Sequence, residues 1–289
     1  MKRQLRKELG LGMLLCSLLV AVPDKGLAGA AEEGTALQAD HEFVRAAVKG
    51  DAVTASKLVD GEFTWTDADG RTLTRTQALN SLPTPALGDE AGAHVARRAY
   101  GQVEAIMVDR DKIHILRVWV KRGAAWRLLV YHEVALGREG ASPADSGTRE
   151  CENPCKTVPY KPKNEVEQEV LTSWEAVETA VANHDAFGWV LYIANEFTML
   201  GSTNEHPLTK ADRVATLNLQ KQTGRAALPP PVVSVQMFDF GDSVVMTCLH
   251  QPYTGKPVRV SRVWIKRDGK WMMSLSFQTT IEAVPAKSS

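Results

Sequence analysis

The stretch Arg117-Val118-Trp119-Val120-Lys121-Arg122 returns later in the same 289-residue chain as Arg262-Val263-Trp264-Ile265-Lys266-Arg267. Each copy leads, at the same spacing, into a further tryptophan, Trp126 or Trp271. Self-similarity over this distance predicts two copies of one structural unit. The repeat therefore decides the architecture before any single residue is considered.

A second repeated motif and a change of composition locate the two copies. Upstream, Glu62-Phe63-Thr64 is echoed by Glu196-Phe197-Thr198. The segment 138–162, between the copies, is rich in glycine, serine, proline and charge, a composition typical of a domain boundary. We predict a first domain over 35–137 and a second domain over 163–283, joined by this linker.

Helices precede strands in each copy. In the second copy, Val166, Val170 and Trp174 begin a spacing of three and four residues that predicts an amphipathic helix. Thr74 and Thr209 are placed to cap a later helix in each copy. The second copy then continues as four strands, predicted at 232–240, 243–250, 257–266 and 270–281. This order predicts an α+β fold with helices packed on one face of a curved antiparallel sheet.

The order helix–helix–strand–helix–meander, with a late Arg-Val-Trp-x-Lys-Arg strand that turns into a tryptophan, resembles NTF2-like (SnoaL-like) domains. More narrowly it resembles the DUF4440-type group, present in two copies. The resemblance implies cone-shaped domains in which the curved sheet and the helices enclose a pocket. The family includes ketosteroid isomerase, dehydratases, polyketide cyclases and many members without a known activity. It therefore implies a pocket and not a particular reaction.

His132 is the candidate catalytic residue. Strict alternation along the last strand of the first copy places Val130, His132 and Val134 together on an apolar face, expected beneath the helices and facing the pocket. A histidine there can act as a general base, because imidazole titrates near neutral pH. The alternative is a hydrogen-bonded core histidine. The second copy has Phe277 at the matching place, and its last strand is expected to be plain core.

Arginine and aromatic residues supply the candidate ligand contacts. Arg117 and Arg262 hold equivalent positions, where a guanidinium could hold an anionic ligand or could stack on a neighbouring tryptophan. The candidate ligand-binding residues are Trp65, His114, Arg117, Trp119, Tyr131, Arg262 and Trp264.

The N-terminus is expected to direct export. A basic start is followed by a short apolar run, and Ala28-Gly29-Ala30 supplies small residues for cleavage after Ala30. A bacterial-type signal peptide over 1–30 predicts a periplasmic or secreted protein, with a retained membrane anchor as the alternative. Without this segment the chain has 29 basic and 32 acidic residues. So balanced a charge does not suggest a nucleic-acid partner.

Three cysteines follow the predicted signal. Cys151 and Cys155 are close enough in sequence to close a local disulfide in the linker, and Cys248 is expected as a buried apolar thiol on a strand. No second cysteine pair and no histidine at ligand spacing accompany them, so neither a metal nor a cofactor is predicted.

These patterns support three functional hypotheses. The first is an exported, non-catalytic protein that binds a small apolar or amphipathic ligand or a partner protein. The second is a SnoaL-like isomerase, cyclase or dehydratase that transfers protons in a first-domain pocket, with His132 as base. The third is a structural pair of domains, formed within one chain or in a homodimer.

Overall fold

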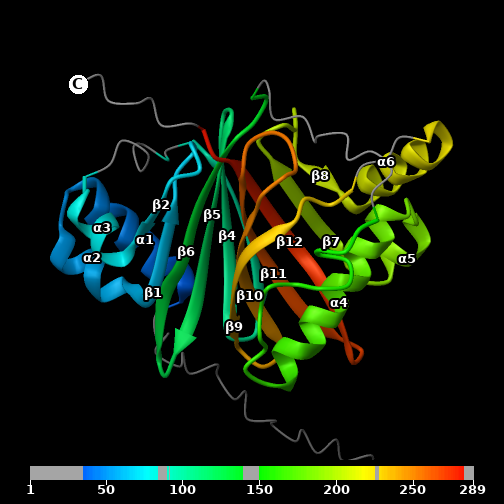
Figure 1. The fold of residues 1–289 in the computed structure, drawn as a ribbon. Coiled ribbons are helices and arrows are strands. Elements are labelled where there is room, and N and C mark those ends of the chain that lie inside the picture. The colour runs from blue at the N-terminus through cyan, green and yellow to red at the C-terminus, as the bar shows by residue number, and fades with distance from the viewer. Residues whose placement is uncertain (1–34, 84–89, 91, 139–149, 225–227, 283–289) are drawn as a thin grey trace, which may run out of the picture. The chain divides into compact units, whose positions relative to one another are not determined.

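The computed structural model describes residues 35–83, 90, 92–138, 150–224 and 228–282. The predicted signal peptide lies outside these residues. Two halves of the described chain each consist of three helices and one six-stranded sheet, and we refer to them as the first and second domains (Figure 1).

The first domain begins with two helices that end where the first strand starts. Thr35 caps the first helix, and its side chain and that of Gln38 satisfy each other's backbone N–H groups. Asp51 caps the second helix by accepting from the Thr54 N–H. The elements of this domain are α1 (Ala36–Val48), α2 (Ala52–Leu58), β1 (Val59–Thr66), β2 (Thr72–Thr74), α3 (Arg75–Asn80), β3 (His94–Tyr100), β4 (Val103–Arg110), β5 (Ile113–Arg122) and β6 (Ala125–Ala135).

The second domain repeats this order with longer first and third helices. Thr74 and Thr209 form equivalent capping boxes at the start of the third helix of each domain, which confirms the predicted caps. The elements are α4 (Glu165–Ala182), α5 (Ala186–Val190), β7 (Ile193–Gly201), β8 (Leu208–Thr209), α6 (Lys210–Thr223), β9 (Val232–Asp239), β10 (Ser243–His250), β11 (Val258–Arg267) and β12 (Lys270–Thr280). The four predicted strands of this domain agree with β9 to β12 within one residue at each end.

The two sheets have the same strand order. The order is β2-β1-β6-β5-β4-β3 in the first domain and β8-β7-β12-β11-β10-β9 in the second. The predicted α+β class is confirmed, but each sheet is mixed, because β1 runs parallel to β6 and β7 runs parallel to β12. In the first domain, α3 connects β2 to β3 at the opposite edge of the sheet, and the antiparallel strands β3 to β6 then bring β6 beside β1.

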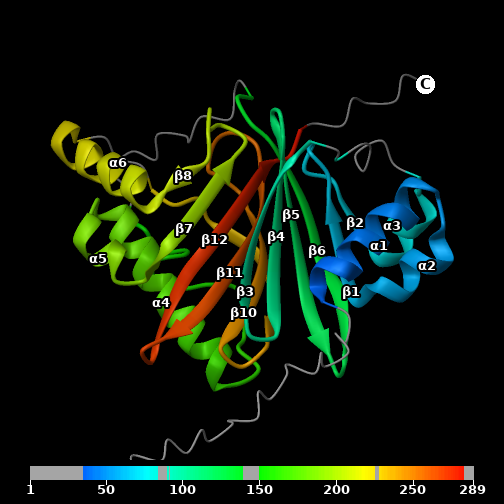
Figure 2. The ribbon, with the colours of Figure 1, turned by 180° about the vertical axis from the view of Figure 1, so that it is seen from behind.

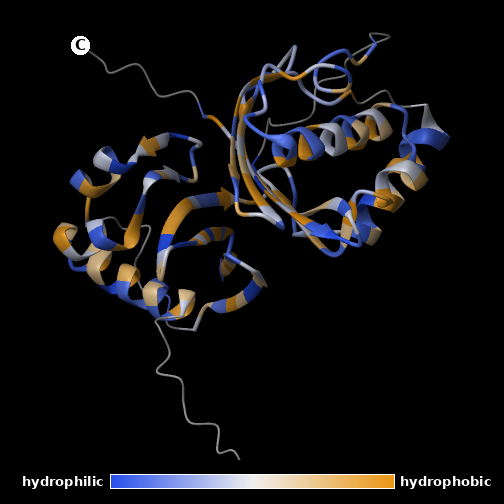
Figure 3. Ribbon diagram, turned by 90° about the horizontal axis from the view of Figure 1, so that it is seen from below, coloured by the Kyte–Doolittle hydropathy of each residue, from blue (hydrophilic) through white to orange (hydrophobic). Residues whose placement is uncertain are grey.

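Helices cover one face of each sheet, and the other faces pack together. Both sheets lie in one compact unit, in which α1 to α3 cover the first sheet and α4 to α6 the second (Figures 1 and 2). Valines and leucines of both sheets form one shared core, including Val118, Val130, Val263 and Leu275. Both hydrophilic and hydrophobic residues occur along the helices, as amphipathic elements require (Figure 3). Each sheet therefore has one face for its own helices and one for the other sheet.

A β-bulge in the last strand of each domain decides which residues face the helices. The register of β5 against β6 shifts after Val118, which leaves Leu129 as an extra residue in β6. The same shift after Val263 leaves Ser274 as an extra residue in β12. An extra residue reverses the alternation beyond it. Tyr131 therefore faces the helices of the first domain.

The connection between the domains packs on the second domain where the structure describes it. Cys151 and Cys155 form a disulfide, and Cys155 is buried. The Asn153 side chain donates to the Val232 carbonyl and accepts from the Val232 N–H, which ties this segment to β9. Among the helices in the described ranges, none has the length and apolar run that a membrane span needs.

Candidate ligand cavity in the second domain

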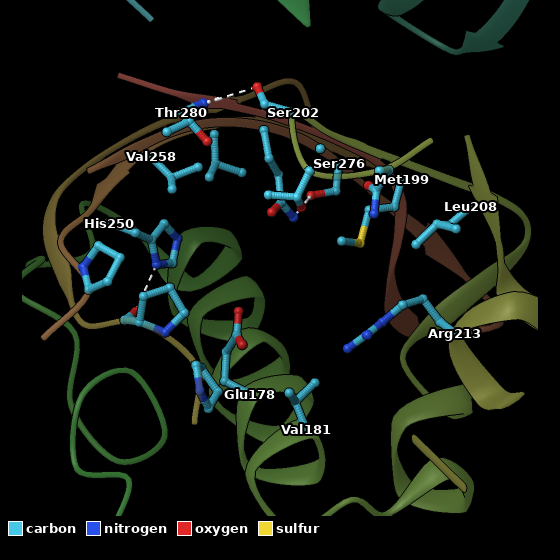
Figure 4. A pocket seen from close by; sticks show the side chains of 18 of the residues that line it. Glu178, Val181, Met199, Ser202, Leu208, Arg213, His250, Val258, Ser276 and Thr280 are labelled. Carbon is cyan, nitrogen blue, oxygen red and sulfur yellow. Dashed lines mark hydrogen bonds between the residues drawn. The ribbon is translucent and has the colours of Figure 1, made fainter. Parts of the chain in front are cut away.

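A cavity of about 530 Å³ lies between the helices and the sheet of the second domain (Figure 4). Helix α4 contributes Val177, Glu178 and Val181, and α6 contributes Arg213 and Thr216. The apolar lining also includes Trp189, Phe197, Met199, Leu208, Val258, Val260 and Met273. Cavities of this size, mostly apolar with a few polar groups, are typical of small-molecule sites.

The bulge in β12 places a polar row on the sheet side of the cavity. Beyond Ser274, the side chains of Ser276, Gln278 and Thr280 line the cavity. Gln278 donates to the Ser276 hydroxyl at 3.0 Å, and the Ser202 hydroxyl accepts from the Thr280 N–H at 3.2 Å. The residues predicted as core in this strand, from Trp271 to Thr279, are buried. They do not share one face as strict alternation predicts, because beyond the bulge Leu275 and Phe277 face the other sheet.

A buried ion pair occupies another part of the lining. The Glu178 Oε1 atom accepts from Arg262 at 3.0 Å and from the Trp174 indole N–H at 2.7 Å. Arg262 also lies over the Trp174 ring, with 4.9 Å between its guanidinium carbon and the ring centroid. Arg262 thus lines the cavity and stacks on a tryptophan, as one of its two predicted alternatives states. The other alternative, that it holds an anionic ligand, stays a prediction.

His250 and Cys248 form a neutral pair at the edge of the cavity. His250 Nδ1 lies 2.9 Å from the Pro230 carbonyl and therefore donates to it, which leaves Nε2 to face the Cys248 sulfur at 3.3 Å. Burial lowers the pKa of His250 to about 4 and raises the pKa of the Cys248 thiol to about 11. At neutral pH neither group carries charge, so Cys248 is the buried thiol that we predicted.

Comparisons with solved structures found similar proteins for part of this chain. A 1.60 Å crystal structure of an NTF2-like protein from Cytophaga hutchinsonii matches 41% of this chain and 99% of its own, with 20% identity and a TM-score of 0.34. An NTF2-like protein of unknown function from Pseudomonas putida matches 43% of this chain and 92% of its own, with 13% identity and a TM-score of 0.35. A protein of unknown function with a cystatin-like fold from Nostoc punctiforme matches 42% and 96%, with 13% identity and a TM-score of 0.34.

Each match spans about one domain of this chain. At these identities the likeness concerns the fold alone. No protein-family model and no curated protein matches the chain.

In the first domain, two aromatic rings occupy the place of the cavity. Trp65 and Tyr131 are register partners on β1 and β6, and their rings stack with centroids 3.9 Å apart. The register partners at the equivalent positions of the second domain are Met199 and Ser276. Trp65 and Tyr131 are 4% and 0% exposed, so in this domain they are part of the core.

The first domain also buries a network of charges. Arg117, 1% exposed, lies 2.8 Å from an Asp40 oxygen and 2.6 Å from a Glu90 oxygen. Asp40 also accepts from the Trp119 indole N–H at 2.8 Å. Burial raises the pKa of Asp40, although Arg117 and Trp119 act to lower it. Arg117 and Trp119 are therefore held by protein groups.

His132 does not face the helices, and the prediction that it lines a first-domain pocket was wrong. The bulge at Leu129 turns His132 toward the second sheet, where Nδ1 lies 2.7 Å from Ser261 and Nε2 lies 3.0 Å from Thr279. Because the Thr279 hydroxyl donates to the Glu133 carbonyl, it accepts from His132 Nε2–H, and Nδ1 accepts from Ser261. Burial, with a contribution from the charge of Arg259, lowers the pKa of His132 to about 3, so the ring is neutral.

Of the seven predicted ligand contacts, only Arg262 lines the cavity. His114 lies on the opposite face of β5 from Arg117, and its Nδ1 atom is 2.6 Å from an Asp109 oxygen. Trp264 is fully buried in the core of the second domain. Aligning the two copies could have located the cavity, because Ser276 takes the place of Tyr131.

Proposed function

We propose that the protein binds a small, largely apolar molecule in the cavity of its second NTF2-like domain, while the first domain acts as a filled structural partner. The main support is a difference between the two domains. The first has the stacked pair Trp65 and Tyr131, and the second has Met199 and Ser276 at the equivalent positions. Two copies with the same strand order differ where a pocket would form, and the smaller pair lies beside a cavity of about 530 Å³.

The positions of the polar groups favour binding over proton-transfer catalysis. His132, the base of the enzyme hypothesis, makes its hydrogen bonds to hydroxyls of the second sheet, away from the cavity. The Glu178 Oε1 atom already accepts hydrogen bonds from Arg262 and Trp174, so it is engaged by protein groups. Hydroxyl and amide groups beside apolar walls suit an uncharged or amphipathic ligand body.

Export remains part of the proposal. The disulfide between Cys151 and Cys155 is compatible with an oxidising compartment outside the cytoplasm. A protein of this kind would capture its ligand in the periplasm or outside the cell.

Introducing the two aromatic residues of the first domain at the equivalent positions of the second should weaken binding. We expect the double variant Met199→Trp/Ser276→Tyr to bind the neutral fluorescent probe N-phenyl-1-naphthylamine about tenfold more weakly, or worse, than the parent protein. The two rings would fill space that the probe requires. A fluorescence titration of each purified protein measures the affinity, and circular dichroism confirms that the variant is folded.

Asn218→Trp is the matched control, because Asn218 is an exposed residue of α6 that does not line the cavity. It should bind the probe like the parent. Equal probe affinity in the parent and the folded double variant would contradict the proposed cavity.

A further inference from the structure

Arg213 has an unusual environment among the charged residues of the cavity. It is half-buried on α6, one residue after the capping box formed by Thr209 and Asp212. Its guanidinium points into the cavity (Figure 4). Over the ranges that the structure describes, no side chain or carbonyl forms a hydrogen bond or an ion pair with it. An arginine in such a place has five N–H donors to offer a ligand.

The other charges of the cavity are already paired. Glu178 accepts from Arg262 and Trp174, and Lys256 forms an ion pair with Glu282. Burial lowers the pKa of Arg213, and the charge of Glu178 offsets this only in part. Among the described residues that line the cavity, one positive charge is therefore in excess, and a ligand with a single negative charge would balance it.

The first domain shows that the fold does not require this arginine. The third helices of both domains start with equivalent capping boxes, so Arg213 corresponds to Ala78. Ala78 is buried, 2% exposed, in the filled domain. The arginine occurs only in the copy that contains the cavity.

We infer that the ligand of the second domain is an organic acid, whose single carboxylate or similar oxyanion binds Arg213 while its apolar body fills the rest of the cavity. A planar guanidinium can bind such a group through two parallel hydrogen bonds. The apolar body would contact the walls that include Met273 and Phe197. This inference rests on the proposed function, since it names the chemical class that the same cavity takes.

Two probes with the same ring system separate the inference from the proposed function. N-Phenyl-1-naphthylamine is neutral, and 1-anilinonaphthalene-8-sulfonate differs from it by one sulfonate. We expect Arg213→Met to weaken binding of the sulfonate at least about tenfold and to leave the affinity for the neutral probe within about twofold. Lys221→Gln, which removes a positive charge from an exposed position on the same helix, should change neither affinity.

The outcomes are distinct. If Arg213→Met loses affinity for the sulfonate probe but keeps its affinity for the neutral probe, the inference is supported. Equal affinity of the parent and Arg213→Met for both probes overturns the inference and leaves the proposed function standing. An equal loss of sulfonate affinity in Lys221→Gln also overturns it, because long-range charge would then explain the effect. Failure of the parent to bind either probe overturns both.

Discussion

Replacing Arg117 with methionine lowers the free energy of unfolding by about 3–5 kcal/mol. Methionine keeps most of the apolar stem but removes the charge that pairs with Asp40 and Glu90. Asp40 is 2% exposed, so its carboxylate would be left in the core without its positive partner. Trp119 would still donate to Asp40, but one neutral donor does not replace a buried ion pair. Urea unfolding followed by tryptophan fluorescence measures the loss.

Arg71→Met provides the comparison for this measurement. Arg71 pairs with Asp67 at 3.1 Å, but its side chain is 66% exposed and that of Asp67 is 23% exposed, so the same substitution should cost less than about 1 kcal/mol. Equal losses for the two variants would show that the Arg117 network is not the buried structural feature described above.

Lowering the pH decreases the free energy of unfolding, because His132 is buried in its neutral form. The folded pKa is about 3, against an ordinary value of 6.5. Above pH 6.5 His132 is neutral in both the folded and the unfolded protein, so its protonation does not reduce the free energy of unfolding. Below pH 6.5 the unfolded chain binds a proton at His132 that the folded protein does not, and the free energy of unfolding decreases. It falls by about 1.4 kcal/mol per pH unit as the pH decreases toward 3. His250, with a folded pKa of about 4, acts in the same direction.

Glu133 opposes this trend over part of the range. Burial raises its pKa to about 7, so between pH 7 and 4.5 the folded protein binds a proton that the unfolded chain does not. The His132 contribution must therefore be measured as a difference between the parent and His132→Gln. Because Glu133 and His250 are present in both proteins, their effects largely cancel.

We expect the stability advantage of the parent over His132→Gln to shrink by about 1.4 kcal/mol per pH unit between pH 6 and 4. Denaturant unfolding at several pH values measures it. Phe277→Leu, a neutral change beside the His132 ring, should cost an amount that does not vary with pH. If the His132→Gln difference is also independent of pH, the histidine is not held neutral between the sheets.

Much of the fold was predictable because it depends on local and repeated signals. The repeated Arg-Val-Trp strand indicated two domains with the same order of elements, and the structure contains two sheets of identical order. The caps at Thr74 and Thr209 were predictable because a threonine three residues before a polar acceptor satisfies the first turn of a helix. The strand Ser243–His250 was predicted without error at either end.

The site was not predictable in the same way, because it depends on two bulges. Leu129 and Val130 are both apolar, so nothing in their hydrophobicity marks one of them as an extra residue. The alternation then assigns His132 to the face beneath the helices and Ser276 to the opposite face, whereas the structure has the reverse. The parallel register of β1 with β6, which brings Trp65 against Tyr131, is a long-range pairing that sequence spacing does not reveal.

A crystal structure of the protein with N-phenyl-1-naphthylamine tests the central claim most directly. We expect the probe between α4, α6 and β12, in contact with Met273 and Ser276, with Trp65 still stacked on Tyr131 in the first domain. A probe bound in the first domain, in place of the contact between those two rings, would contradict the assignment of the second domain as the binding domain.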